Sequence, residues 1–252
     1  MEIVKTISSY LASAPPTLRA FRDCPAYSRC VVGAVGSGKT TAAAVEMVER
    51  GLDFESSRWV VVRNTYRELV DTTQKTFFEW FPPGLYGTYH ASSMTYLMEL
   101  PVTIKDAASG KVTKEYRSRI EILFRSAERE NDVKKFKSLE VTGYWIDEAM
   151  EVIKEVKLML DNRCRYPANA KRYYSILTTN PPTVRHWIYQ DYFADPPNGQ
   201  VGFQQQPFEN EANLPVGYYQ RLLEQYKNNQ DWIKRYIYGE WGAVQMGEAV
   251  YP

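Results

Sequence analysis

Short apolar runs alternate along this chain with longer segments of helical character. The run at residues 58–63 is nearly continuous in apolar side chains, which is typical of a strand covered on both faces of a sheet. Similar runs predict strands at residues 28–32, 58–63, 93–100, 118–124, 141–146, 173–178 and 201–205. Helices are predicted up to residue 11, at 41–50, at 66–80, from 147 to about 163, after 183 and at about 215–238. This alternation predicts an α/β fold with a mainly parallel central sheet flanked by helices.

The alternation changes at two places. Residues 106–111, between two predicted strands, are mostly small or polar and indicate the tip of a hairpin-like excursion. Near the C-terminus, helical segments follow one another without a strand between them. We therefore expect a core at residues 1–210 and a small helical subdomain within residues 211–252.

The turn after the first predicted strand carries the clearest functional signal. Residues 33–40, GAVGSGKT, match the pattern G-x-x-x-x-G-K-[ST] and lie between a strand and a helix, the context that this motif requires. Glycines let the backbone curl around a phosphate, and the helix N-terminus adds partial positive charge. Lys39 would reach the β- and γ-phosphates of ATP, and the Thr40 hydroxyl would hold Mg²⁺. The residues predicted to surround the nucleotide here are Gly33, Ala34, Val35, Gly36, Ser37, Gly38, Lys39, Thr40 and Thr41.

Two acidic residues follow the predicted strand at 141–146. Asp147 would lie at the carboxyl end of the sheet, where α/β folds bind ligands, and would support Mg²⁺ largely through its water shell. Glu148 would orient and deprotonate the attacking water, a role compatible with capping the next helix. The next strand ends at Thr179 and Asn180, which would contact the γ-phosphate or that water. A plain turn before two prolines is the alternative interpretation of these last two residues.

Composition narrows the class of protein. With 44% hydrophobic and 24% charged residues among 252, the chain is ordinary for a soluble globular protein. Its three cysteines lack zinc spacing, and its two histidines make a His-based metal site or triad improbable. Without a signal pattern or an apolar run of about 18 residues, we expect an intracellular protein with no membrane partner. The net charge of +1 leaves only local patches for a polyanion.

The three motifs, in this order and followed by a helix-rich tail, resemble the ATPase domain of the large terminase subunit of tailed bacteriophages. The resemblance covers nearly the whole chain. Residues 33–40 resemble the family's Walker A motif, 145–149 its Walker B motif with the catalytic Glu, and 178–180 its coupling motif. The Thr-Thr-Asn triplet at 178–180 and the Gly-Glu-Trp at 239–241 narrow the choice among ATPases with Walker motifs.

This resemblance implies an ASCE-type P-loop NTPase, the class with a catalytic Glu beside the Walker B Asp. It implies a motor that pumps double-stranded DNA into a procapsid in the cytoplasm of the infected host cell. The partners implied are further copies of the chain in a ring on the portal, and a small terminase subunit. It also implies that the end of the 211–252 segment begins a linker to a nuclease domain that this sequence lacks, so we expect no DNA cleavage.

The sequence leaves open which positively charged residue completes such a site. The loop at 33–40 lacks the Arg that many relatives carry there. Some relatives have a trans-acting Arg about ten residues before the Walker B Asp, where this chain has Lys137. Lysine can neutralise charge but lacks the bidentate fork of guanidinium. Arg125 and Arg129 are rival candidates, and each of the three could instead be a solvated surface charge.

The DNA contact and the nucleobase contact are less defined. Two basic clusters are candidates for the DNA contact. The first consists of Lys111, Lys114, Arg117 and Arg119, and the second of the lysines of residues 134–137. The alternative interpretation is a basic hairpin that faces solvent. Tyr27 or Arg29 could touch adenine. Two other functions stay open, a helicase-like translocase that separates strands and a nucleotide-gated assembly module without useful turnover. Glu148 argues against the module, because a pure switch needs no water activator.

Overall fold

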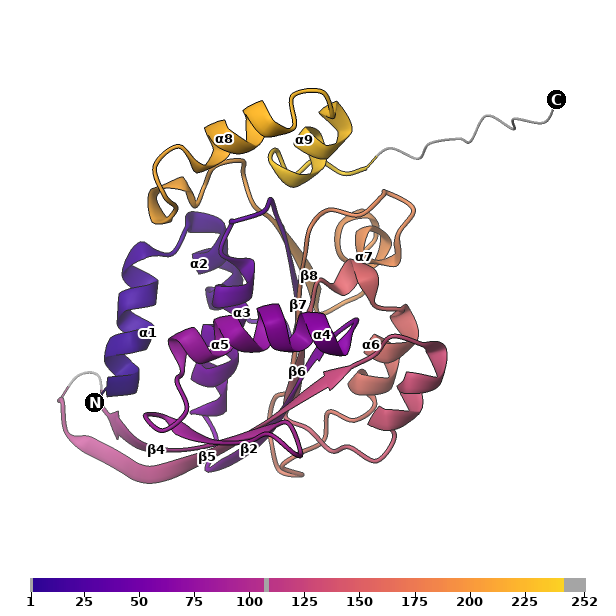
Figure 1. Ribbon diagram of the computed structural model, residues 1–252. Coiled ribbons are helices and arrows are strands. Elements are labelled where there is room, and N and C mark those ends of the chain that lie inside the picture. The colour runs from indigo at the N-terminus through magenta and orange to yellow at the C-terminus, as the bar shows by residue number, and fades with distance from the viewer. Residues whose placement is uncertain (1, 107–108, 243–252) are drawn as a thin grey trace.

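The computed structural model describes residues 2–106 and 109–242, and within this part of the chain the strands form one twisted sheet (Figure 1). The strands are β1 (Ser28–Val32), β2 (Ser56–Arg63), β3 (Gly87–His90), β4 (Thr95–Lys105), β5 (Val112–Ser126), β6 (Gly143–Asp147), β7 (Tyr174–Thr179) and β8 (Gln200–Gln204). Their order is β3-β4-β5-β2-β6-β7-β1-β8. Neighbours from β5 to β8 are parallel, and β4 pairs antiparallel with both β3 and β5. The prediction of a mainly parallel sheet is confirmed.

Helices cover both faces of this sheet (Figure 1). One face carries α1 (Glu2–Ser13), α2 (Pro16–Asp23), α3 (Lys39–Gly51) and a continuous helix made of α4 (Tyr66–Glu68), the π-helical η1 (Leu69–Gln74) and α5 (Lys75–Trp80). The other face carries α6 (Lys154–Asp161), α7 (Trp187–Tyr189) and the π-helical η4 (Gln190–Ala194). Short 3-10 helices are η2 (Glu130–Phe136), η3 (Ala149–Glu151) and η5 (Glu211–Asn213).

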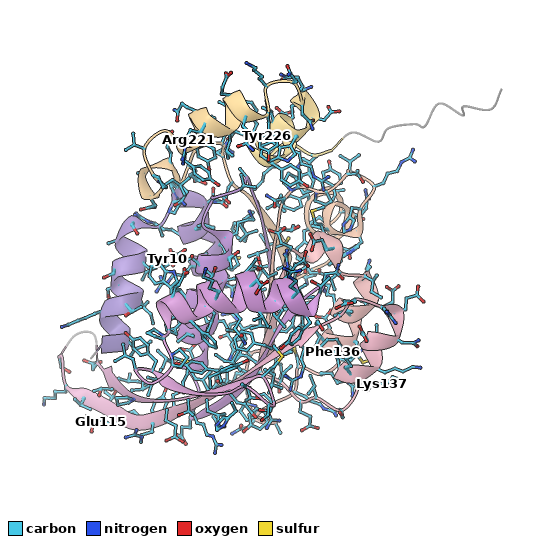
Figure 2. The ribbon with its side chains drawn as sticks, in the orientation of Figure 1. Tyr10, Glu115, Phe136, Lys137, Arg221 and Tyr226 are labelled. Atoms are coloured by element: carbon cyan, nitrogen blue, oxygen red, sulfur yellow. The ribbon has the colours of Figure 1, made fainter. Side chains whose placement is uncertain are left out.

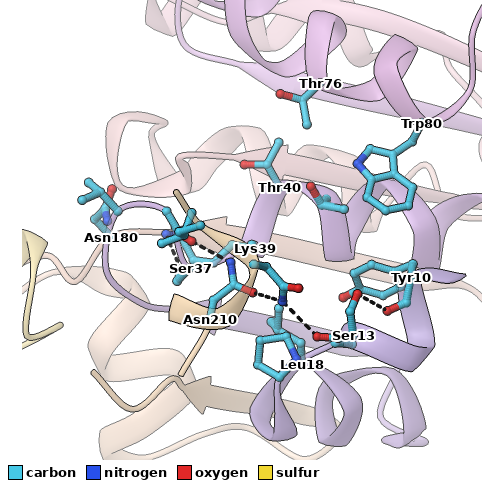
Figure 3. Close-up of a pocket in the computed structure, with 18 of the residues that line it drawn as sticks. Tyr10, Ser13, Leu18, Ser37, Lys39, Thr40, Thr76, Trp80, Asn180 and Asn210 are labelled. Atoms are coloured by element: carbon cyan, nitrogen blue, oxygen red, sulfur yellow. Dashed lines mark hydrogen bonds between the residues drawn. The ribbon is translucent and has the colours of Figure 1, made fainter. Parts of the chain in front are cut away.

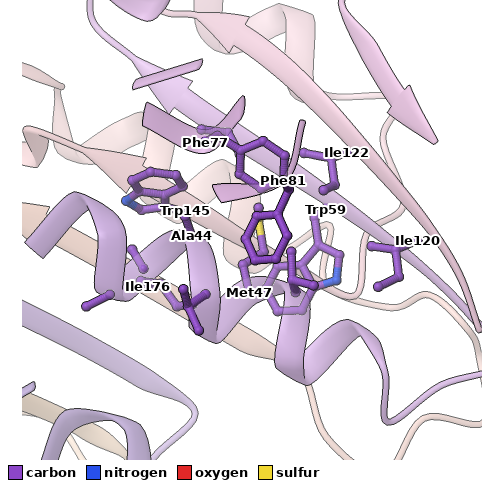
Figure 4. Packing of buried hydrophobic residues seen from close by; sticks show 14 of the residues in the cluster. Ala44, Met47, Trp59, Phe77, Phe81, Ile120, Ile122, Trp145 and Ile176 are labelled. Atoms are coloured by element: carbon purple, nitrogen blue, oxygen red, sulfur yellow. The ribbon is translucent and has the colours of Figure 1, made fainter. Parts of the chain in front are cut away.

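The alternation of side chains in β2 explains why the sheet has two cores. Trp59 and Val61 point into the cluster beneath α3, whereas Val60 and Val62 point into the cluster beneath α6. Figure 4 shows Trp59 and Trp145 packed with side chains from α3 and α5. Each fully buried large apolar side chain contributes about 1.5–3 kcal/mol to folding. This packing fixes the central strands, whose carboxyl ends carry the motif residues.

Three elements differ from the sequence prediction. Helix α2, which was not predicted, begins at Pro16, a position where the missing N–H costs nothing. Strand β3 has no clear sequence signal. The arms β4 and β5 extend past β3 and β2 as a projecting two-stranded ribbon, longer than predicted. Its tip falls in the predicted segment 106–111, of which residues 107–108 lie outside the described residues.

The C-terminal helices α8 (Tyr218–Gln225) and α9 (Gln230–Tyr236) form a small cluster of their own around Tyr219, Ile233 and Ile237. In Figure 1 they lie above the carboxyl edge of the central strands. The predicted start of a linker includes residues 243–252, which lie outside the described residues. Among the helices described, none has the length and apolar character that crossing a bilayer requires.

Candidate active site

The phosphate-binding motif forms a tight loop between β1 and α3 (Figure 3). Gly36 and Gly38 have φ angles of 68° and 84°, the left-handed region that glycine adopts without strain. Helix α3 begins at Lys39, so the N–H groups of its first turn have no helical acceptor. Such N–H groups, together with the helix dipole, attract an anion to the concave side of the loop.

Two of the predicted loop amides are used elsewhere. The Gly33 N–H donates to the Thr179 carbonyl at 3.2 Å, and the Val35 N–H donates to the Tyr236 carbonyl at 2.8 Å. These two amides are therefore not free to bind a phosphate, although Val35 still lines the cavity. Gly33 and Ala34 also lie outside the cavity lining, where their carbonyls serve the lysine of the motif. Residues 35–41 line the cavity.

Lys39 lies inside the loop, with its side chain across the concave side. Its Nζ donates to the carbonyls of Gly33 at 3.1 Å and Ala34 at 2.8 Å, and to the Ser37 Oγ at 3.3 Å. Burial lowers the pKa of Lys39 to about 8, and the negative charge of Asp147 opposes this shift. The ammonium is thus held by neutral oxygens that a phosphate oxygen can replace.

The C-terminal segment clamps the outer side of this loop. The Tyr219 hydroxyl donates to the Val35 carbonyl at 3.0 Å, and the Asn210 amide donates to the Gly36 carbonyl at 2.8 Å. The ring of Tyr218 lies so close that a Cβ added at Gly36 would meet it at 3.0 Å. The loop therefore depends on residues more than 170 positions away in the sequence for its shape.

Asp147, at the end of β6, lies beside the first turn of α3. Its Oδ1 accepts hydrogen bonds from the Thr40 hydroxyl at 3.3 Å and the Thr178 hydroxyl at 2.8 Å. Its Oδ2 accepts one from the Thr73 hydroxyl at 2.6 Å. Mg²⁺ prefers oxygen ligands such as carboxylates and hydroxyls, so Thr40 and Asp147 fit a magnesium site. Their 3.3 Å separation brings together two motifs that lie 107 residues apart.

Glu148 and Asn180 face the same cavity from neighbouring strands. Glu148 adopts a left-handed conformation, with φ of 46°, which costs a residue other than glycine about 1–3 kcal/mol. Its Oε2 accepts from the Asn180 N–H at 3.3 Å, and the Asn180 side chain donates to the Gly33 carbonyl at 2.8 Å. The left-handed backbone conformation and the contact with Asn180 place the Glu148 carboxylate at the wall of the cavity.

Thr179 corrects the sequence prediction. Its side chain is fully buried and outside the cavity lining, and its hydroxyl accepts from the Met150 N–H and donates to the Asn180 carbonyl. The β-strand alternation turns Thr179 away from the cavity. Thr178, also fully buried, contacts Asp147 instead of a nucleotide.

The cavity has a volume of about 640 Å³ and extends from the loop to the N-terminal helices. Figure 3 shows Thr76 and Trp80 on one side of it and Tyr10 and Leu18 beyond Lys39. Sequence reasoning missed these wall residues, whose only signal is their place on amphipathic helices. The complete additional lining consists of Tyr10, Ser13, Ala14, Pro15, Leu18, Thr76, Trp80, Asn210, Asn213 and Leu214.

Neither residue predicted to touch adenine, Tyr27 or Arg29, lines this cavity. Arg29 is fully buried, where its Nη1 lies 2.7 Å from the Glu46 Oε1 and its guanidinium packs on Phe21. Tyr27 lines a separate hollow with Asp161 and Arg172, beside the amino ends of β1 and β7. The cavity beside the phosphate loop is lined instead by residues of α1 and α2, among them Tyr10 and Leu18.

The candidates for the positive residue that completes the site lie outside this cavity. The Arg125 guanidinium donates to the carbonyls of Ser93 and Phe124, and burial lowers its pKa. Arg125 therefore has a structural role, and its guanidinium is not free to complete the site of another copy. Lys137 is exposed at the end of η2 and points outward in Figure 2, as a contact to another molecule requires. Arg129 is exposed as well.

The first basic cluster divides between the two faces of the ribbon. Lys114 lies 2.8 Å from the Glu55 Oε1. Arg117 and Arg119 share the opposite face, because residues two apart in a strand point the same way. Glu99 lies opposite Arg119 in the strand register, and Figure 2 shows Glu115 on the projecting part of the ribbon. In the second cluster, Lys135 pairs with Asp132 at 2.9 Å.

Comparison with known proteins gives a family match. A family model described as phage terminase large subunit matches residues 26–240. No curated protein matches. The large terminase of a thermophilic bacteriophage is similar in fold, with a TM-score of 0.68 and 14% identity over 96% of this chain and 53% of that one. The ATPase domain of the Thermus phage P74-26 large terminase has a TM-score of 0.61 and 14% identity over 88% of this chain and 91% of that one.

A third structure, the large terminase of bacteriophage HK97, has a TM-score of 0.55 and 11% identity over 90% of this chain and 50% of that one. The chain thus spans about half the length of the first and the third of these proteins. Two further structures of the first protein, the large terminase of the thermophilic bacteriophage, are complexes, one with ADP and one with ATP-γ-S. At these identities the likeness concerns the fold.

Proposed function

Because this chain belongs to the phage terminase large-subunit family, we propose that it is an ATP-hydrolysing motor domain that drives double-stranded DNA into a procapsid. The observation that carries the proposal is that Thr40, from α3, and Glu148, which follows β6, line one cavity, while Asp147 accepts a hydrogen bond from the Thr40 hydroxyl beside it. The nucleotide complexes of the thermophilic bacteriophage protein support ATP as the ligand. The assembled ring on the portal, the small subunit and the host cytoplasm are further parts of this proposal.

The chemistry follows from the positions of the side chains. The ammonium of Lys39 would leave the loop carbonyls for the β- and γ-phosphates. The Thr40 hydroxyl and Asp147 would hold Mg²⁺, which supplies charge neutralisation when bound. Glu148 would accept the proton of the attacking water. Asn180, which is hydrogen-bonded to Glu148 and to Gly33, would link hydrolysis to the position of the phosphate loop.

Phosphate release from ATP, measured with Mg²⁺ and duplex DNA, tests this function. We expect multiple turnovers and no separation of a forked duplex. Strand separation would favour a helicase-like translocase. Stoichiometric ATP binding without phosphate release, at every protein concentration and with DNA present, would favour the assembly module and contradict the motor.

We propose that the exposed Lys137 completes the site of a neighbouring copy. Lys137→Ala subunits keep an intact cavity but lack the donor, whereas Glu148→Gln subunits keep the donor but have an inactive cavity. Mixing the two should restore part of the phosphate release that neither gives alone. If every mixing ratio gives only the sum of the two separate activities, Lys137 does not act in trans.

We propose that the ribbon formed by β4 and β5 contacts DNA, since a two-stranded ribbon fits the major groove. Replacing Arg117 and Arg119 together with Gln should reduce DNA stimulation of the ATPase and lower the slope of log affinity against log salt by about two. Basal activity should not change. Lys134→Gln in the second cluster is the comparison. A larger effect from Lys134→Gln, with full stimulation in the ribbon variant, would move the DNA contact to η2.

A further inference from the structure

A buried hydroxyl on the helix after β2 has no part in the mechanism above. Leu69, Thr73 and Phe77 are spaced four residues apart and are all 0% exposed. Thr73 is thus a polar side chain in the middle of an apolar stripe that faces the core. A hydroxyl in this position is costly unless it is hydrogen-bonded. Its partner is the Asp147 Oδ2, at 2.6 Å.

Each oxygen of Asp147 has its own hydroxyl donors. The Trp145 Nε1 donates to the Thr178 hydroxyl at 2.8 Å, so the Thr178 proton is directed to the Asp147 Oδ1. The Thr40 hydroxyl shares that oxygen. Within the part of the chain that the structure describes, the Thr73 hydroxyl donates to the Oδ2. The orientation of the carboxylate therefore depends on hydroxyls from three different elements.

Thr73 lies within the π-helical turn η1, at residues 69–74. Such turns insert one extra residue into a helix and occur frequently at functional sites. After this turn, Thr76 and Trp80 line the nucleotide cavity (Figure 3). The one helix thus contacts Asp147 through Thr73 and the cavity through the residues that follow.

We propose that Thr73 is a positioning residue that fixes the carboxylate plane of Asp147 for Mg²⁺, an inference that rests on the proposed function. The terminal torsion of an Asp side chain is broad, so a carboxylate needs hydrogen bonds to hold one orientation. Mg²⁺ tolerates little deviation in the placement of its ligands, and Asp147 would support it largely through the water shell. Loss of the hydroxyl at 73 lets the carboxylate turn and weakens metal binding, while the phosphate loop stays intact.

The test compares Thr73→Val, which keeps the shape but loses the hydroxyl, with Thr73→Ser, which keeps the hydroxyl. ADP and ATP-γ-S affinities are measured by calorimetry in EDTA and over a Mg²⁺ series, and bound Mn²⁺ is counted by electron paramagnetic resonance. We expect Thr73→Val to bind nucleotide normally in EDTA and to need about tenfold more Mg²⁺ for its half-maximal effect. Thr73→Ser should resemble the wild type.

Thr72→Val is the matched control, because the exposed Thr72 hydroxyl donates to the Glu68 carbonyl within its own helix. If Thr73→Val does not fold, Thr73→Ala removes the same hydroxyl without bulk beside the carboxylate. Equal Mg²⁺ dependence in the wild type and the hydroxyl-free variant overturns the inference. Should Asp147→Asn also leave Mg²⁺ dependence unchanged, the metal site of the proposed function fails instead.

Discussion

Glu148→Gln should bind ATP as the wild type does and hydrolyse it about 10²–10⁴-fold more slowly. The amide has nearly the shape of the carboxylate and can still meet the Asn180 N–H through its oxygen. It cannot accept the proton of the attacking water. Single-turnover phosphate release and equilibrium binding of ATP-γ-S separate the two effects.

The control is Glu155→Gln, which changes an exposed carboxylate near the start of α6. It should leave turnover unchanged. Unimpaired hydrolysis in Glu148→Gln would remove Glu148 from its role as the base. A loss of ATP binding equal to the loss of turnover would assign Glu148 to binding and not to the chemical step.

Lys39→Ala should weaken ATP binding about 10–100-fold, the loss expected for a charge-assisted hydrogen bond worth about 1.5–3 kcal/mol. Turnover should fall further, because the ammonium would also stabilise charge on the transferred phosphate. Binding is measured by calorimetry and hydrolysis by phosphate release. The variant also loses the contacts to the Gly33 and Ala34 carbonyls, so its melting temperature must be compared with the wild type.

Lys75→Ala changes an exposed lysine at the start of α5 and serves as the matched control. It should leave both measurements unchanged. If a folded Lys39→Ala protein binds ATP with wild-type affinity and turns it over normally, the loop does not hold the phosphates of ATP. The proposed function would then lose its main support.

Local sequence was sufficient for those parts of the site whose function depends on a continuous motif. The loop at 33–40 and the strand before Asp147 were predicted because glycine spacing and apolar runs are visible without tertiary structure. The same holds for the alternating order of strands and helices. Even there, the sequence could not reveal that the amides of Gly33 and Val35 are used by backbone carbonyls from β7 and α9.

The remaining site residues depend on how distant elements meet. Thr73 and Trp80 lie on a helix whose sequence predicts only an amphipathic element, and their contacts depend on where β2 places it. Thr179 was misassigned because a polar residue at a strand end can face either side of the sheet. The burial of Arg29, which lies within β1, could not be predicted because it depends on an ion pair with Glu46 of α3 in the core.

The clamp on the phosphate loop has a consequence for how the chain can be divided. Tyr219, Tyr236 and Asn210 supply three of the hydrogen bonds that shape residues 35 and 36. Two of these three belong to the C-terminal helices α8 and α9. A fragment ending at residue 210 would contain the three motifs at 33–40, 145–149 and 178–180 and still lack part of the scaffold that shapes the first of them. The scaffold that holds the phosphate loop in shape therefore extends to α9, although the sequence places those helices in a separate subdomain.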